Sequence, residues 1–403
     1  MMSALAKVIH GQESGDSDPH TPISREQTGS RVVLFSNTSW YLYNFRLQLL
    51  ETLRSEGYDV VLVSPRDTYT DRLIEAGFEW RDIELDRRSV NPLAQVGVLL
   101  HLWKLWRQLR PHTLHLFTIK CVVLGGLSAR LARVPRRVHA IAGLGSVYSD
   151  RSKRWLRIAV TAALRLATAG ARSDVIVQNP DDAALLVRQQ IVSRNRVHLI
   201  RGSGVDGERF RVDRNPAAET RIRFLFAARL LWAKGIRDFV KLAEQSTTAH
   251  VEFMIAGEPD PGNPDSVDNE FLQRCQQVDN LTMLGHVDDM AALLRKVSVM
   301  VLPSSYGEGV PRTLVESAAA SLPLIAYDVP GSREIVLNGR NGFLCQPGDF
   351  DALQSAANRL AQDPALRQQF GEGSRMHFET EYDQRTVNRK TLDVYRGVAV
   401  RGG

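Results

Sequence analysis

The chain has 403 residues, of which 43% are hydrophobic and 24% charged, a composition typical of a soluble globular protein with room for two domains. Its three cysteines, Cys121, Cys275 and Cys345, lack metal-ligand spacing, which argues against a disulfide framework or a zinc site and favours a reducing cytoplasm. The formal charge of +6 predicts an anionic partner: nucleic acid, acidic lipid or a phosphorylated ligand.

The N-terminal segment differs in composition from the rest of the chain. Residues 1–30 are rich in Gly, Ser, Asp, Thr and Pro and lack the apolar centre of a signal peptide, so they are predicted to form a disordered tail. The longest apolar stretch, residues 92–106, is interrupted by Gln95, His101 and Lys104. It is also shorter than a membrane span requires, so we expect a protein that does not cross a membrane.

Short β-branched runs alternate with helical patterns along the whole chain. The predicted strands are 31–36, 59–65, 113–117, 136–143 and 174–179 in the first half, and 223–229, 251–257, 281–285, 299–304 and 322–328 in the second. This alternation predicts an α/β protein with two parallel sheets covered by helices. The polar stretch 202–220 predicts the link, with domains at 31–205 and 206–379.

Loops that follow parallel strands are the places where ligands bind, so the candidate site is sought there. Arg229 and Lys234 stand five positions apart in ARLLWAKG, the segment into which one predicted strand runs. A guanidinium and an ammonium together can neutralise a diphosphate and stabilise it as a leaving group. The alternative is that both are ordinary surface cations. The Asp-x-Asp formed by Asp16 and Asp18 lies in the predicted tail, so no metal is expected.

A strand, a glycine loop and a helix are predicted over residues 298–319. Glu308 lies in the loop, Glu316 lies eight positions later in the helix, and the backbone N–H groups of Gly309, Val310 and Arg312 would open the helix. Such a helix start favours an anion. At ~1.5 Å rise per residue the two carboxylates would lie roughly 10–12 Å apart, about the span from the sugar to the ribose of a sugar nucleotide. Otherwise both are solvated acids.

Several motifs of the second half occur together: ARLLWAKG, GHVDDM, LPSSYGEGVPRTLVESAAASLPLIAYDVPGSREIV and NGFL. As a group they resemble the second domain of retaining glycosyltransferases with two facing Rossmann-like domains (GT-B type) and a Glu-x7-Glu motif. The resemblance implies a donor cleft between the domains and a C-terminal helix, within 380–403, that crosses back. It implies that Glu308 contacts the transferred sugar and Glu316 the ribose. Further implied contacts are Arg229 and Lys234 on the diphosphate, and the loop with His286 and Val287 on the base.

The first half narrows the resemblance through YNFR, SPRDTYTDRL, DRRSVNP, HLFTIKC and AIAGLGSVYSD. These are similar to bacterial transferases that extend a sugar on diphospho-undecaprenol. Three cations are candidates for the acceptor phosphates, with solvated loop cations as the alternative: Arg46 after the first strand's loop, Arg88 in a short polar turn, and Lys120 at the end of the predicted strand 113–117. Gly143 and Gly145 would let the backbone approach the donor. His115, inside an apolar strand, reads as a core histidine.

Some relatives place a catalytic His near the Ala142–Gly143 position. This chain has no ionisable residue between Ile141 and Ser146, so no general base is assigned. The leaving phosphate of the donor would then take the acceptor proton.

Basic and aromatic residues alternate in two helical stretches. Residues 151–172 place Arg154, Arg157 and Arg165 at helical spacing, and residues 92–110 contain Trp103 and Trp106. This pattern suits the headgroup region of an anionic membrane, although a core helix with one solvated basic face gives the same pattern.

Together these features predict a cytoplasmic enzyme that is peripheral on the inner face of the cell membrane. We expect a retaining transferase that moves a hexose or N-acetylhexosamine from a nucleotide sugar, with UDP expected, to a lipid diphosphate-linked sugar in bacterial surface polysaccharide or glycan assembly. No cofactor is expected. The alternatives are a nucleotide-sugar epimerase of the same architecture and a non-enzymatic two-domain binding protein. Nucleic acid is not an expected partner, because neither a recognition helix nor a stacking aromatic platform is evident.

Overall fold

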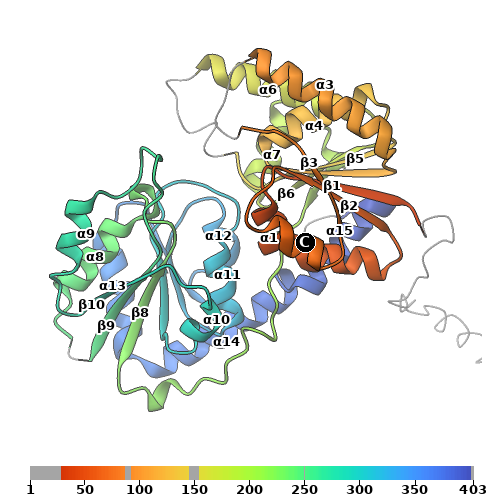
Figure 1. Cartoon of the computed structure of the whole chain (residues 1–403). Coiled ribbons are helices and arrows are strands. Elements are labelled where there is room, and N and C mark those ends of the chain that lie inside the picture. The colour runs from red at the N-terminus through yellow and green to blue at the C-terminus, as the bar shows by residue number, and fades with distance from the viewer. Residues whose placement is uncertain (1–28, 87–91, 145–153, 249, 401–403) are drawn as a thin grey trace, which may run out of the picture.

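Two parallel β-sheets with helices packed against them make up the part of the chain that the structure describes (Figure 1). The structure is a computed structural model, and it describes residues 29–86, 92–144, 154–248 and 250–400. One sheet belongs to a first domain and the other to a second domain. The predicted α/β architecture with two Rossmann-like domains is therefore confirmed.

The first domain is built on a sheet with the strand order β3-β2-β1-β4-β5-β6-β7. Its strands are β1 (Arg31–Phe35), β2 (Asp59–Ser64), β3 (Glu79–Asp82), β4 (Thr113–Phe117), β5 (Arg136–Ile141), β6 (Ser173–Val177) and β7 (Val197–Leu199). Its described helices are α1 (Ser39–Ser55), α2 (Thr70–Glu75), α3 (Pro92–Leu109), α4 (Ile119–Leu131), α6 (Arg154–Thr168) and α7 (Pro180–Arg188). The strand order reverses between β1 and β4, where a ligand crevice is expected in such a sheet.

Strand β1 is buried on both of its faces, as a central parallel strand should be. Successive side chains point to opposite faces of the sheet. On one face the Phe35 ring packs edge-on against Trp106 of α3, with 5.8 Å between the ring centroids. On the other face Leu34 shares a core with Leu50 of α1. The run of apolar residues in this strand therefore supports two separate layers of helices.

The second domain is built on a sheet with the strand order β10-β9-β8-β11-β12-β13. Its strands are β8 (Ile222–Ala227), β9 (Val251–Ala256), β10 (Leu281–Gly285), β11 (Val299–Leu302), β12 (Leu324–Tyr327) and β13 (Gly342–Cys345). Its described helices are α8 (Ile236–Gln245), α9 (Asn269–Cys275), α10 (Met290–Leu294), α11 (Arg312–Ala319), α12 (Ser332–Ile335), α13 (Phe350–Gln362) and α14 (Pro364–Glu381). The chain ends with α15 (Gln384–Arg396).

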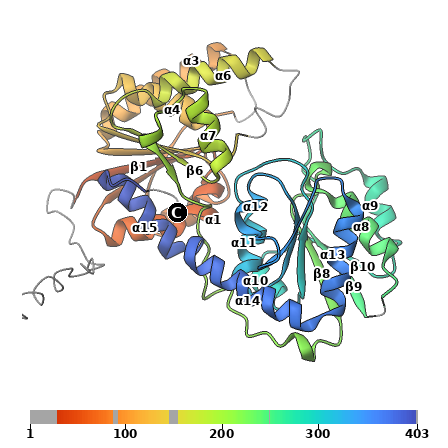
Figure 2. The ribbon, with the colours of Figure 1, turned by 180° about the vertical axis from the view of Figure 1, so that it is seen from behind.

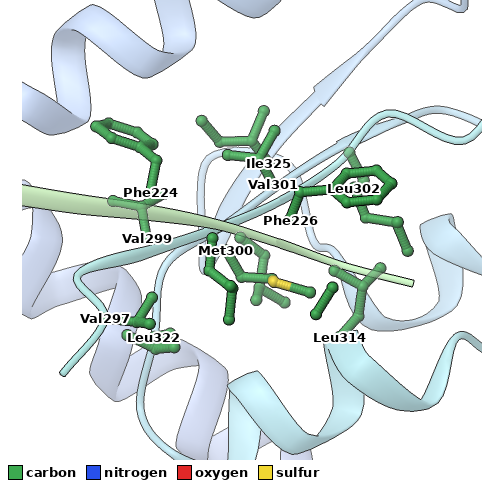
Figure 3. Packing of buried hydrophobic residues seen from close by; sticks show 14 of the residues in the cluster. Phe224, Phe226, Val297, Val299, Met300, Val301, Leu302, Leu314, Leu322 and Ile325 are labelled. Atoms are coloured by element: carbon green, nitrogen blue, oxygen red, sulfur yellow. The ribbon is translucent and has the colours of Figure 1, made fainter. Parts of the chain in front are cut away.

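The core of the second domain fixes the start of α11 relative to the sheet. Figure 3 shows Phe224 of β8 and Val301 of β11 packed in one cluster with Leu314 of α11. Leu314 is fully buried, and it lies two residues before Glu316 in the sequence. Burial of such apolar side chains holds the helix, and the loop before it, against the carboxyl ends of the strands.

All ten predicted strands are present, each within two residues of its expected ends. The strands β3, β7 and β13 were not predicted. All three lie at sheet edges, where side chains need not be apolar. The sequence of β3, for example, is Glu-Trp-Arg-Asp, which carries no strand signal.

The stretch 202–220, predicted as the link, packs largely with the second domain. Val205 and Phe210 are part of the second-domain core, and the Val205 N–H donates to the Tyr382 carbonyl over 3.1 Å. From there α15 runs back along the first domain and contacts α1 (Figure 2). Tyr395 of α15 is buried in the first-domain core. The two domains are therefore joined by two segments of the chain.

Both ends of the chain extend beyond what is described. Residues 1–28 and 401–403 lie outside the described residues. Gly29 and Ser30, which the sequence predicts as part of the tail, instead pair with the chain around the start of β2, where the Gly29 N–H donates to the Gly57 carbonyl over 2.8 Å. Among the described residues, no helix combines the length and the apolar character that a membrane span requires.

Candidate active site

Loops from the two domains meet at the carboxyl ends of β5 and β11. A Cβ atom added to Gly309 would lie 1.9 Å from the carbonyl oxygen of Ala142, and one added to Gly143 would lie 2.9 Å from the Gly309 nitrogen. Neither position tolerates a side chain without movement of the backbone. Gly143 therefore permits a close approach of the Glu308 loop of the second domain, whereas the sequence predicted an approach to the donor.

The turn between β6 and α7 holds that loop through two amides. The backbone N–H of Val310 donates to the side-chain oxygen of Gln178 over 3.1 Å. The side-chain amide of Asn179 donates to the Glu308 carbonyl over 3.4 Å. The Val310 N–H, which the sequence predicted to be open to an anion, is thus occupied by the first domain. The sequence does not single out Gln178 and Asn179, because the predicted strand 174–179 includes them, whereas β6 ends at Val177 and leaves both in the loop where ligands bind.

Asp182 of α7 positions the residues that make this contact between the domains. Its carboxylate accepts hydrogen bonds from the Asn179 side chain over 2.9 Å and from the Leu144 N–H over 3.3 Å. Burial raises the pKa of Asp182, and these hydrogen bonds oppose that rise. One buried carboxylate therefore positions both the loop after β5 and the turn after β6.

Lys234, which follows β8, forms an ion pair with Glu308 in the loop after β11. Lys234 lies in the short turn after β8, and its side chain is 9% exposed, against 24% for Glu308. The ammonium also lies 5.2 Å from the centre of the Tyr306 ring. Gly235 ends the turn with a φ of +82°, and a Cβ there would lie 1.9 Å from the Pro303 carbonyl oxygen. The turn that places Lys234 therefore requires glycine at its end.

Arg229 lies just after β8 and forms a different ion pair. Its guanidinium pairs with Asp260 over 2.6 Å and is 61% exposed. Arg229 lines a cavity of about 330 Å³ at the carboxyl ends of β8, β9 and β10, together with His286, Val287 and Thr313. The structure thus brings together three of the predicted donor residues, and it adds Asp260 and Thr313, which were not predicted.

Glu316 is buried in α11 and paired with Arg312 over 2.7 Å. Burial raises the pKa of Glu316, while the Arg312 guanidinium opposes the rise. Arg312 also reaches the first domain, where it donates to the Asn44 carbonyl over 2.9 Å and lies 4.8 Å from the Phe45 ring centre. Glu316 is therefore not the solvated helix acid of the alternative interpretation.

The candidate acceptor residues have different surroundings from those expected. Arg46 is not a loop cation but lies in α1, with 6% of its surface exposed. Lys120 lies at the start of α4 and donates to the Asp86 carbonyl. Arg88 and Gly145 lie outside the described residues. His115 is buried, as expected of a core histidine.

The prediction that Trp106 belongs to a membrane-binding face is wrong. Trp106 is 1% exposed and donates from its indole nitrogen to Ser128 over 2.8 Å, so it belongs to the core. A helical pattern alone does not say which face of α3 meets the sheet. Five other large apolar side chains of this layer are each more than half exposed: Val96 and Leu100 of α3, Leu131 of α4, and Ile158 and Leu166 of α6.

Two sequence models of glycosyltransferase families match this chain. Residues 31–179 match the family described as "Glycosyl transferase 4-like", and residues 208–377 match "Glycosyl transferases group 1". The two matched segments correspond to the two domains of the structure.

Two curated relatives act on lipid-linked sugars according to their names. The N,N'-diacetylbacillosaminyl-diphospho-undecaprenol alpha-1,3-N-acetylgalactosaminyltransferase of Campylobacter jejuni is 24% identical over 91% of this chain and 98% of the relative. The UDP-Gal:alpha-D-GlcNAc-diphosphoundecaprenol alpha-1,3-galactosyltransferase of Escherichia coli is 26% identical over 79% and 84%, respectively.

Solved structures share the fold. The Anabaena protein HepE in complex with UDP superimposes with a TM-score of 0.75 at 16% identity, covering 92% of this chain and all of that one. A glycosyltransferase from Rickettsia africae ESF-5 gives a TM-score of 0.74 at 14% identity, over 92% and 98% of the two chains. With its two parallel-sheet domains and its two family matches, this chain belongs to the glycosyltransferases of GT-B fold.

Proposed function

We propose that this glycosyltransferase moves a hexose or N-acetylhexosamine, with retention of configuration, from a UDP-linked sugar to a lipid diphosphate-linked sugar. The observation that carries the proposal is the Lys234–Glu308 pair beside the start of α11. Thr313 of α11 lines the 330 Å³ cavity, while Glu308 lies five residues earlier in the sequence. A nucleotide in that cavity would direct its diphosphate along the helix start toward Glu308.

Six of the predicted donor residues then have tasks that suit their surroundings. His286 and Val287 hold the base, and Glu316, buried and paired, accepts from the ribose hydroxyls. Arg229 and Lys234 neutralise the diphosphate, and Glu308 contacts the sugar. Because Lys234 is mostly buried, its charge is screened less by solvent than that of a surface lysine.

The reaction forms one bond and breaks one bond. The acceptor hydroxyl oxygen bonds to the anomeric carbon as the bond from that carbon to the diphosphate oxygen breaks. The electron pair stays on the leaving diphosphate, which Lys234 and Arg229 stabilise. The hydroxyl proton passes to the leaving phosphate oxygen on the same face of the sugar, which retains the configuration. No protein base is required, and we propose that no metal is required.

The choice of substrates is supported by the relatives. The names of both curated relatives state a diphospho-undecaprenol acceptor, the Escherichia coli name states a UDP-sugar donor, and the Anabaena structure holds UDP. A lipid acceptor also requires the enzyme to reach a membrane surface.

The layer formed by α3, α4 and α6 is the proposed membrane-binding face. It combines the five exposed apolar side chains with Arg157, Lys104 and Arg130, which suits an anionic headgroup layer. In Figure 1 this layer lies at the edge of the first domain, away from the second domain.

The test is a product assay with a panel of UDP-, GDP- and dTDP-sugars and a prenyl diphosphate-linked N-acetylhexosamine acceptor. We expect a disaccharide on the lipid only with a UDP-sugar, and an NMR coupling constant that shows the donor's anomeric configuration. An epimer formed from donor alone would instead identify an epimerase. Absence of turnover with every pair would favour a binding protein.

A further inference from the structure

Arg46 is buried in the first domain without a counter-charge. Its guanidinium lies 4.6 Å from the centre of the Phe117 ring and donates to the Tyr41 hydroxyl over 2.9 Å. Among the described residues, no carboxylate pairs with it, and its Nε–H has no hydrogen-bond partner. Burying an unpaired cation and an unpaired donor is unfavourable for folding. A ligand that completes the site would offset this cost.

His115 contributes a second buried donor to the same place. Its Nδ1 lies 2.6 Å from the Tyr395 hydroxyl, and within the described chain that hydroxyl has no other acceptor, so the O–H donates to Nδ1. The ring proton therefore sits on Nε2. Burial lowers the pKa of His115, and the Arg46 charge lowers it further, so the ring is neutral. The Nε2 atom has no partner among the described residues.

Both side chains line one small cavity behind the contact between the domains. The cavity has a volume of about 10 Å³, which is the space of about one water-sized atom. Gln178 forms part of its wall, and the oxygen of that side chain is already engaged by Val310. The rest of the wall is mostly apolar: Ala140, Ile141, Ile176, Ile200, Gly202 and Thr391. The cavity thus presents N–H donors and one positive charge.

We propose that Arg46 and His115 form a subsite for one anionic oxygen of a phosphate group. If the proposed function holds, that oxygen belongs to the diphosphate of the lipid acceptor, because the subsite lies in the first domain, beyond the second-domain cavity assigned to the donor. Gln178, which stands between the cavity and the Val310 N–H, must turn aside to admit the rest of the phosphate. The subsite would also fix which phosphate oxygen faces the sugar donor.

A buried water is the competing occupant. A water could accept from both donors, but its own hydrogens would then need acceptors. A phosphate oxygen accepts two or three hydrogen bonds and needs no acceptor in return, so it matches the donors better.

The experiment measures the melting temperature of the full chain with UDP at saturation, so that the donor site is filled. Inorganic pyrophosphate is then added at about a hundred times its Kd, and farnesyl diphosphate in a parallel series. We expect each to raise the melting temperature of the wild type by about 3 °C. Arg46→Met should lose this rise while keeping the rise caused by UDP. Arg54→Met is the matched control, since Arg54 lies in the same helix, 4.6 Å from the Phe78 ring centre.

Equal rises in the wild type and in Arg46→Met would overturn the subsite, as would no rise in the wild type with either ligand. Without ligand, Arg46→Met should melt no lower than the wild type, because an unpaired buried cation has been removed. A lower melting temperature together with a full pyrophosphate response would assign Arg46 a structural role only. Should Arg46→Met fail to fold, His115→Phe removes the other donor and should weaken pyrophosphate binding. A rise with farnesyl diphosphate alone would assign the subsite to the lipid. Failure of UDP itself to bind would count against the proposed function instead.

Discussion

The side-chain oxygen of Gln178 accepts a hydrogen bond from the backbone N–H of Val310 over 3.1 Å. The first domain therefore occupies one of the N–H groups just before α11. If the donor diphosphate uses that N–H, Gln178 and the diphosphate compete for it. Gln178→Ala should then bind UDP about fivefold more tightly, as the loss of a competing bond of about 1 kcal/mol implies. Turnover should fall, because the Glu308 loop loses its contact with the first domain.

Gln178→Glu should change UDP affinity in the opposite direction. A carboxylate at this position would hold the N–H more strongly and repel the diphosphate, so UDP affinity should fall. Calorimetric titration of UDP checks both variants, with Gln48→Ala, an exposed glutamine of α1, as the control. Identical UDP affinities in all three variants would show that the contact does not compete with the donor.

Lys234→Ala should lower turnover by about two orders of magnitude, since about 3 kcal/mol of charge stabilisation in the transition state is lost. Removal of Lys234 also leaves Glu308 without its partner. Steady-state kinetics at saturating donor checks this, and Lys241→Ala, an exposed lysine in α8, is the control. Turnover close to the wild-type rate would remove Lys234 from the mechanism.

Chelation should leave activity unchanged, because Arg229, Lys234 and the start of α11 supply the positive charge that a metal would otherwise supply. The rate is measured after exhaustive treatment with EDTA and again after added magnesium or manganese. Loss of activity that either ion restores would contradict the prediction.

Substitutions of Glu308 and Glu316 should affect different steps, turnover in one case and UDP binding in the other. Glu308→Gln should lower turnover with little effect on UDP binding, whereas Glu316→Gln should weaken UDP itself. Titration of UDP and single-turnover rates distinguish these effects. The reverse pattern would exchange the two assignments.

Glu316 also predicts a pH dependence of stability. Because its pKa is raised in the folded state, its stabilising contribution is complete below the unfolded value of about 4.5 and is lost as pH rises through the folded pKa. The melting temperature of Glu316→Gln relative to wild type should therefore increase between pH 4.5 and pH 7. A constant difference across that range would show that Arg312 fully compensates for burial.

Membrane binding should depend on the apolar side chains of α6 as well as on its arginines. Ile158→Ser/Leu166→Ser and Arg157→Glu should each weaken binding to anionic vesicles, and salt should weaken wild-type binding, with a Debye length of about 8 Å at 0.15 M. Co-sedimentation measures this, with Met376→Ser, an exposed apolar residue of the second domain, as the control. Unchanged binding in both variants would mean that this helix face is only solvated.

Short-range patterns in the sequence determined much of this protein. Ten of the strands were predictable because apolar β-branched runs bounded by polar loops have few other stable arrangements. Arg229, Lys234, Glu308 and Glu316 could be singled out because each lies in a segment that continues from a predicted strand, either in the loop or in the helix that follows. The edge strands β3, β7 and β13 escaped, since an edge position does not require an apolar sequence.

Only the tertiary structure decided which residues meet across the domains. Gln178 and Val310 are 132 positions apart, and nothing local to either predicts that they share a hydrogen bond. The burial of Arg46 and Trp106 likewise depends on which face of α1 and of α3 the sheet covers, and a helical pattern is compatible with more than one choice. Such contacts arise from packing between distant segments, so the chemistry near Gln178 and His115 became readable only once those segments were placed against each other.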